Sequence, residues 1–333
     1  MSLGRRGWTR IGMGAALAGA VGLGLLAVPA GAGAAPELPP VTAEELISSV
    51  MTADPGPFNG TVKLDNQLGL PALPQLPQAA NGTSTATVWS DGDRKGRVSL
   101  PTGQTERTLV ADGTTVWSWN SADRTVTKSP ESEGPHRRPA ADPTAAATEV
   151  VKHLRATSTV DVDGTAEVAG RSAYELVLAP APTERTLLRE VRVAVDAEKR
   201  VPLQLTVLAT GSSDPALRLG FTDLTFGAQD PSLFTFTPPP GATVQERPAH
   251  AEDAKPGAAK PTVVGDGWDT VVIAKAPTGE RAPELAALGK PVSGPWGNGR
   301  EFTTAVGTAI VTDDGRIAVG AVPEQVLTEA LTK

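Results

Sequence analysis

Side chains suited to acid–base, nucleophilic or metal chemistry are scarce in this chain. It has three histidines and no cysteine, so a thiolate nucleophile, a disulfide and a cysteine-ligated metal are excluded. His136 and His250 fall in polar stretches and His153 falls on a predicted helix, where a histidine is usually solvated. The sequence has no Gly-x-Ser-x-Gly, His-Glu-x-x-His, P-loop or dinucleotide-binding motif. We therefore expect no enzyme activity, no catalytic residue and no cofactor.

Two aspartate-rich stretches superficially resemble calcium-binding loops. They are Asp161-Val162-Asp163-Gly164 and Asp313-Asp314-Gly315. Neither continues with the oxygen ligands that an EF-hand loop needs at its later positions. An Asp-Gly turn explains both stretches, and we expect no metal site.

The start of the chain predicts export. Arg5, Arg6 and Arg10 precede an uncharged run at 11–28, and Ala32-Gly33-Ala34 fits a cleavage motif. We predict a signal peptide at 1–34 and an extracytoplasmic protein, secreted or associated with the cell envelope. The run is also long enough to cross a bilayer, so it is either removed or kept as an anchor.

Charge and length limit the partners and the domain count. The net charge of −7, without a basic stripe of interleaved aromatics, argues against a nucleic-acid partner. About 300 residues follow the predicted signal, enough for two domains. The stretch 245–262 has no apolar periodicity and is a predicted linker. We place a first domain at 35–244 and a small second domain at 263–333.

The first predicted domain is dominated by apolar residues at every second position. Val191, Val193 and Val195 share one side of a strand, and similar strands run from Ser158 to Phe236. Upstream, Asp112-Gly113 marks a hairpin turn. Consecutive strands with one apolar side predict an antiparallel sheet with one apolar and one wet face.

Two helices are predicted within this domain. One spans Thr42–Ala53 and begins with the spacing of a capping box. The other spans Pro143–Arg155, with Asp142 as its N-cap and proline at its first position. Helices laid across a curved sheet either complete a filled interior or cover a cavity.

Aromatic residues are the candidate lining of that interior. On physical grounds alone, a place in an ordinary filled core explains these aromatic residues at least as well as a cavity lining does. The candidates are Trp89, Trp117, Trp119, Phe221 and Phe226. Trp117 and Trp119 are two residues apart and so point to the same side of their strand. A proline-interrupted loop carries Leu70, Leu73 and Leu76, which we expect at the mouth of a cavity.

Three short motifs follow one another along this domain. Residues 112–120 form a DG-x-x-hydrophobic-W-x-aromatic-type hairpin, 170–178 a G-x-x-x-Y-x-L-x-L strand, and 234–242 an F-x-F-x-P-P-x-G ending. In type and order the series resembles the LolA-like lipoprotein carriers over residues 37–244. The resemblance implies a mainly β fold with helices (α+β): an unclosed antiparallel β-barrel with a helical lid over a hydrophobic cavity for acyl chains.

Two further implications follow from the resemblance. The carriers lock the lid with an arginine near the hairpin at 89–98, where this chain offers only Arg94 and Arg97 as substitutes. A carrier-like domain followed by a smaller one is similar to the MucB/RseB type of sigma-E regulator. Residues 316–323 carry the V-G-x-V-P ending of that second domain, which implies a small C-terminal domain with strands and helices.

Three hypotheses remain open on the sequence. The favoured one is a monomeric, non-enzymatic extracytoplasmic protein that holds a lipid acyl chain or a lipoprotein, as carrier or sensor. The second is an RseB-like regulator whose residues 263–333 dock on a membrane-bound anti-sigma factor or another envelope protein. The third is a structural envelope protein with a filled barrel.

Overall fold

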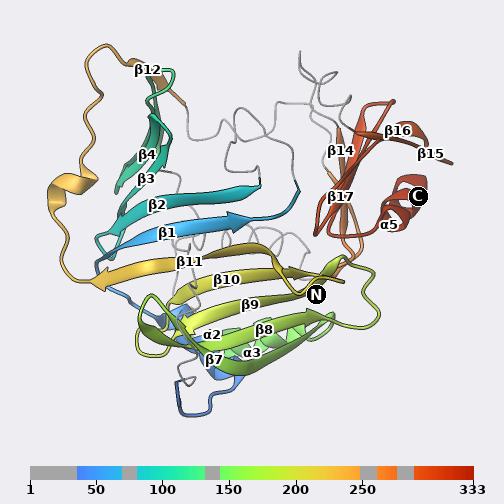
Figure 1. The fold of residues 1–333 in the computed structure, drawn as a ribbon, viewed down its shortest axis with the longest axis horizontal. Helices are drawn as coiled ribbons and strands as arrows, with labels where there is room; N and C mark the ends of the chain where they lie inside the picture. The colour runs from blue at the N-terminus through green and yellow to red at the C-terminus, as the bar shows by residue number, and fades with distance from the viewer. Residues whose placement is uncertain (1–35, 70–80, 132–142, 248–260, 276–288) are drawn as a thin grey trace, which may run out of the picture.

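The computed structural model of the chain describes residues 36–69, 81–131, 143–247, 261–275 and 289–333 (Figure 1). For residues 143–147 it describes the backbone alone. The predicted signal peptide at 1–34 and the histidines His136 and His250 lie outside the described residues.

A large sheet of twelve strands is built from the first part of the chain. Its strands are β1 (Phe58–Asn66), β2 (Gly82–Ser90), β3 (Lys95–Thr102), β4 (Thr105–Asp112), β5 (Thr115–Asn120), β6 (Thr125–Pro130), β7 (Ser158–Val168), β8 (Arg171–Pro180), β9 (Leu188–Asp196), β10 (Pro202–Ala209), β11 (Pro215–Phe226) and β12 (Thr243–Glu246). They follow the order β12-β6-β5-β4-β3-β2-β1-β11-β10-β9-β8-β7 and leave β12 and β7 as free edges.

The predicted fold class is confirmed. The sheet is unclosed, mainly antiparallel and accompanied by few helices, and a separate smaller sheet follows it. One feature differs from the prediction: β12 pairs with β6 in parallel, so the large sheet is mixed.

Two helices pack on one face of the large sheet, α2 (Ala43–Thr52) and α3 (Pro143–Leu154). The expected capping box begins α2, because Thr42 and Glu45 exchange hydrogen bonds between side chain and backbone. Both helices contribute to a core with strand residues Tyr174 and Leu176, and Figure 1 shows them against β7–β9. The helices are thus held to the sheet by apolar contacts.

The pairing registers define the two faces of the large sheet. Residues paired across antiparallel strands lie on the same face. The row of paired residues Leu176, Val193, Leu205, Leu219 and Leu64 therefore lies on the face that α2 and α3 cover. We call this the helix face, and the opposite side the outer face.

The second sheet has six antiparallel strands in the order β13-β14-β18-β17-β16-β15. They are β13 (Thr262–Val264), β14 (Val271–Lys275), β15 (Lys290–Gly294), β16 (Gly297–Thr303), β17 (Thr308–Thr312) and β18 (Arg316–Gly320). Helix α5 (Glu324–Thr332) follows Pro323, and its buried Val326 and Leu327 pack with Ile310 and Ala318. One face of this sheet is thereby covered.

The structure corrects one predicted boundary. The strands were expected to continue to Phe236, but a short 3₁₀ helix, η2 (Pro231–Phe234), follows β11, because Asp230 caps it and proline stands at its first position. The predicted linker at 245–262 begins inside β12 and ends inside β13. The division into domains at 35–244 and 263–333 stays a prediction.

A buried carboxylate closes the turn between β9 and β10. Asp196 is fully buried, is paired with the Arg171 guanidinium, and accepts hydrogen bonds from the backbone N–H groups of Glu198 and Lys199. Burial alone would raise the pKa of Asp196, but the hydrogen bonds from Arg171 and the two N–H groups outweigh it and lower that pKa. The turn is therefore held by an ionised Asp196.

We expect Asp196→Asn to lower the free energy of unfolding by roughly 2 kcal/mol at neutral pH, because Arg171 loses its charged partner. The lowered pKa of Asp196 stabilises the fold above the ordinary carboxyl pKa, and this contribution is lost as the pH falls through the lowered value. Urea unfolding from about pH 7 downward measures both effects. The exposed Glu198, also paired with Arg171, supplies the control Glu198→Gln, which should cost less than about 0.5 kcal/mol. If the unfolding free energy of Asp196→Asn falls with decreasing pH as steeply as that of wild type, the role assigned to an ionised Asp196 is contradicted.

Candidate ligand-binding face

The phenylalanines at one end of the large sheet form an aromatic cluster. Phe58 lies edge-on to Phe221 and to Phe226, with ring centroids 6.3 Å and 6.2 Å apart. Phe221 is buried at 2% exposure and belongs to a core that includes Val88. Gly60 leaves room for this ring, because a Cβ atom there would stand 2.8 Å from Phe221 Cδ1. Two of the five predicted aromatic residues, Phe221 and Phe226, thus meet in one cluster.

This cluster lies on the helix face. Val62 pairs with Phe221 and with Ala86, while Leu64, two residues along the same strand, belongs to the row that defines that face. Phe226 pairs with Phe58 and so lies on the same side as Phe58. The apolar surface under the helices therefore continues from β7–β9 across to β1 and β2.

The helix face extends further onto β3, β4 and β5. Val88 pairs with Val98, and Val98 pairs with Leu109, so these side chains stand on one side of the sheet. Val98 is half-buried, whereas Leu109 is 40% exposed. The helix face thus ends in apolar residues that solvent, or a ligand, can reach.

The three predicted tryptophans lie on the other side of the sheet. Trp89 pairs with Arg97, Arg97 with Val110, and Val110 with Trp117. Val88 and Trp89 are consecutive in one strand, so they face opposite ways. The tryptophans are therefore on the outer face, and the five aromatic residues do not form one lining.

The outer-face tryptophans have partners of their own. The Trp117 ring lies 5.7 Å from the Phe236 ring, its Nε1 donates to Asp112 Oδ2 at 3.1 Å, and Lys128 Nζ stands 5.6 Å from its centre. Phe236 follows η2, so the chain segment that leaves β11 packs against the Trp117 ring. This arrangement indicates a structural contact for Trp117.

The two candidate lid-locking arginines also have other partners. The Arg97 guanidinium lies 6.0 Å from the Trp89 ring centre and donates to the Leu233 carbonyl oxygen at 3.4 Å, on the outer face. Arg94 is exposed and lies 3.3 Å from a Glu131 carboxylate oxygen. Neither forms an ion pair or hydrogen bond with the described side chains of α2 or α3. The helices are instead joined to each other by an ion pair of Arg155 with Glu44.

The predicted mouth residues Leu70, Leu73 and Leu76 lie outside the described residues. Their place at a cavity mouth stays a prediction.

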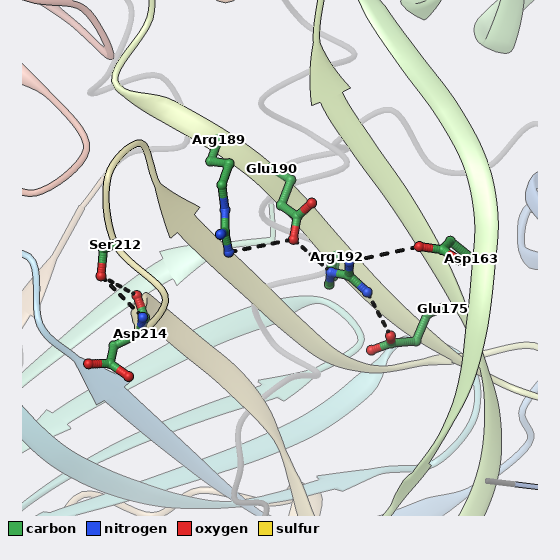
Figure 2. Close-up of polar contacts among 7 residues, drawn as sticks. All are labelled: Asp163, Glu175, Arg189, Glu190, Arg192, Ser212 and Asp214. Carbon is green, nitrogen blue, oxygen red and sulfur yellow. Dashed lines mark hydrogen bonds and ion pairs between the residues drawn. The ribbon is translucent and has the colours of Figure 1, made fainter.

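Charged residues occupy the outer face of β7, β8 and β9. The Arg192 guanidinium lies 2.9 Å from Glu190 and 3.0 Å from Glu175, with Asp163 at 3.9 Å, as Figure 2 shows. The hydrogen bond that Arg192 donates to Glu190, together with the charges of Glu190 and Glu175, raises the pKa of Arg192 against the lowering effect of its burial. Over β7, β8 and β9 the large sheet therefore has a charged outer face opposite an apolar helix face.

Contacts between the two sheets were not predicted. Trp268 Nε1 donates to Ser158 Oγ at 2.7 Å, and its backbone N–H donates to Glu184 at 2.7 Å. Arg185 pairs with Glu329 of α5 through two hydrogen bonds, at 2.9 Å and 2.5 Å. These partners are 84 to 144 residues apart in the chain, so no local pattern identifies them. Ser158 follows α3 closely, so this contact with Trp268 lies next to the C-terminal end of that helix.

Within the described residues, an apolar row on one face of the second sheet is uncovered. Val263 pairs with Val272, Val272 with Val319, and Val319 with Ala309, on the face opposite the α5 core. Val263 is 52% exposed and Val319 is 44% exposed. Exposed apolar side chains gathered in a row are a feature of interaction surfaces.

The described part of the chain has neither a metal-binding cluster nor a membrane-spanning helix. There, no three histidine, aspartate or glutamate side chains are grouped so that they could hold a metal ion. None of the helices in the same residues has the length and apolar character to cross a membrane.

Solved structures of similar fold were found by comparison. MucB in the Pseudomonas aeruginosa MucA/MucB complex matches with a TM-score of 0.48 and 18% identity, over 87% of this chain and 96% of that one. A LolA superfamily protein from Nitrosomonas europaea matches with a TM-score of 0.26 and 12% identity, over 59% of this chain and 99% of that one. The predicted resemblance is confirmed as structural similarity, which at these identities concerns the fold. No protein-family model and no curated protein matches the chain.

If the protein holds a lipid, as the sequence predicts, Trp117→Ala should leave lipid retention unchanged, because Trp117 is on the outer face. The same change removes the contact with Phe236 and should lower the unfolding free energy by roughly 2 kcal/mol. This is less than the loss expected when a fully buried tryptophan is replaced by alanine. Urea unfolding and mass spectrometry of retained palmitate measure the two quantities. Trp119 is on the same face, so Trp119→Ala should also leave lipid retention unchanged. Loss of palmitate from folded Trp117→Ala returns this residue to the lining.

Proposed function

We propose that this protein is an extracytoplasmic, non-enzymatic binding protein that holds a lipid acyl chain or a lipoprotein on the helix face, as carrier or sensor. The observation that carries the proposal is the continuity of that face, from the buried Phe221 cluster to the 40%-exposed Leu109. An extended apolar strip, covered at one end by helices and open at the other, matches the shape and chemistry of an acyl chain.

The energetics of such a site favour reversible capture. Burying one methylene contributes roughly 0.8 kcal/mol, so a chain of about sixteen carbons offers on the order of 12 kcal/mol before costs. Ordering the chain and displacing side chains that rest on the face oppose this gain. The net affinity is then modest enough for release to a membrane or another protein.

Helices α2 and α3 act as the lid in this proposal. They rest on the sheet through apolar side chains such as Leu46 and Val151, both fully buried, and are joined by the Glu44–Arg155 pair. Apolar contacts can be exchanged for a ligand's methylenes at little cost, which suits a lid. The predicted signal at 1–34 would place the protein outside the cytoplasm, as a soluble shuttle if it is cleaved or as a tethered sensor if it is kept.

We expect Leu109→Glu to abolish acyl-chain binding, because it places a carboxylate on the open end of the helix face. Leu109 is partly exposed, so the unfolding free energy should change by about 1 kcal/mol or less. Detergent-free native mass spectrometry of the protein from its own host measures the bound fatty-acyl species.

The matched control is Val244→Glu, which changes another exposed apolar residue (48% exposed), on β12 at the edge of the sheet. It should keep the acyl species. A single mass equal to the mature chain, in wild type and both variants, contradicts lipid binding and favours the hypothesis of a filled, structural barrel.

The uncovered row of the second sheet supports a second candidate, a regulator that docks on a membrane-bound anti-sigma factor. The solved complex of MucB with MucA is an interaction of those proteins; for this chain the supporting observation is the exposure of Val263 and Val319. A β face of this kind suits an apolar segment of a protein partner.

For this second candidate we expect Val319→Glu to weaken capture of the extracytoplasmic part of an anti-sigma factor from the same host at least tenfold. The reason is that a charge on the uncovered row loses apolar contact with the partner. Biolayer interferometry measures the dissociation constant, and Val244→Glu again serves as control. Equal affinity of Val319→Glu and wild type excludes this row as the docking surface.

A further inference from the structure

A hollow of about 230 Å³ lies at the end of the large sheet where β1 ends and β2 and β11 begin. Its walls include Asp65 and Asn66 from β1, Thr83 from β2, and Pro215 and Arg218 from β11. The backbone N–H of Gln67 donates to the Ala216 carbonyl at 2.9 Å and ties the ends of β1 and β11 together. The hollow is thus built on strand ends that are joined by hydrogen bonds.

One atom of Arg218, a residue that lines this hollow, lacks a hydrogen-bond partner among the described residues. This atom, Nε of the guanidinium, is buried. Within the same residues no carboxylate lies within ion-pair distance of the guanidinium. Leaving a buried charged donor unpaired costs free energy. Because its Nε has already lost its water, a ligand that pairs with the rest of the guanidinium meets a smaller desolvation cost.

The one carboxylate in the hollow is already neutralised. Asp65 is the cross-strand neighbour of Arg218, but its Oδ1 lies 3.0 Å from Lys63 Nζ and accepts a hydrogen bond from Thr83 Oγ1 at 2.7 Å. The three charged groups, Lys63, Asp65 and Arg218, therefore leave one positive charge in excess.

A neutral donor faces the same space. Asn81, which also lines the hollow, accepts the Gly69 N–H with its Oδ1 at 2.7 Å. The oxygen of this amide is used by the backbone, so its NH₂ end remains as a donor. A guanidinium and an amide NH₂ on the walls of one hollow are donors of the kind that a carboxylate or phosphate accepts.

We propose that this hollow binds a small oxyanion group, a carboxylate or a phosphate, held by Arg218. The site is separate from the acyl-chain site. In the strand register Arg218 lies opposite Asp65 and Thr206, on the outer face, whereas its chain neighbours Leu217 and Leu219 lie on the helix face. The proposal therefore stands or falls independently of lipid binding.

The test is thermal unfolding of the exported protein with inorganic phosphate or acetate at constant ionic strength, kept constant with sodium chloride. We expect the melting temperature to rise and saturate with at least one of the two anions. Stabilisation by phosphate alone identifies a phosphate site, and stabilisation by acetate alone identifies a carboxylate site. If neither anion stabilises the protein, the proposal is overturned.

Variants assign the effect to Arg218. Arg218→Gln should lose the shift, and Arg218→Lys should bind at least tenfold more weakly, because lysine keeps the charge without the planar fork. Arg189→Gln, an exposed arginine of β9 outside the hollow, should bind as wild type does. If the melting temperature shifts equally in wild type and in the three variants, the anions act through a general ionic effect and the proposed site is overturned.

A direct readout covers the case in which Arg218→Gln does not fold. The ¹⁵Nε resonance of Arg218, assigned by its disappearance in Arg218→Lys, should move with anion concentration along the same saturation curve. A resonance that stays in place through the titration overturns the proposal.

Discussion

The architecture depends on cross-strand pairing that keeps every apolar side chain of a row on one side. The row from Leu176 through Val193, Leu205 and Leu219 to Leu64 spans five strands without losing its face. Because side chains alternate with a period of two residues, a slip of one residue in any pair would present that strand's leucines to water. The burial of α2 and α3, the phenylalanine cluster and the charged outer face all follow from this single register.

The register of the large sheet shifts at several points, and one of these shifts lies beside the aromatic cluster. Between Thr61 and Val62 the pairing of β1 with β11 shifts by one residue, so β11 carries an extra residue there. Bulges of this kind bend a strand and increase its twist. The shift lies beside Phe221, at the point where the sheet passes from the helix-covered strands to the open ones. The curvature of the sheet and the seat of its aromatic cluster thus have a common origin.

Alternation and turn chemistry predicted the strands, the Asp112-Gly113 hairpin and the capping box at Thr42, because these depend on neighbours in sequence. The same alternation could not assign Trp117 to a face, since a period of two is equally satisfied on either side until the pairing with Val110 is known. It also could not predict the contact of Trp268 with Ser158, or the donors around Arg218, which are brought together by three strand ends. Propensity rules describe segments, and these features depend on how segments pair.

The parallel pairing of β12 with β6 has a practical meaning for anyone who shortens this chain. A sheet edge with free N–H and C=O groups recruits strands from other molecules, and β12 covers that edge of β6. The boundary at 244 suggested by composition cuts β12 in half, whereas one after Arg247, whose N–H donates to the Lys128 carbonyl, keeps the cover whole. Solubility of an isolated first unit would then be decided by three residues that contribute nothing to its core.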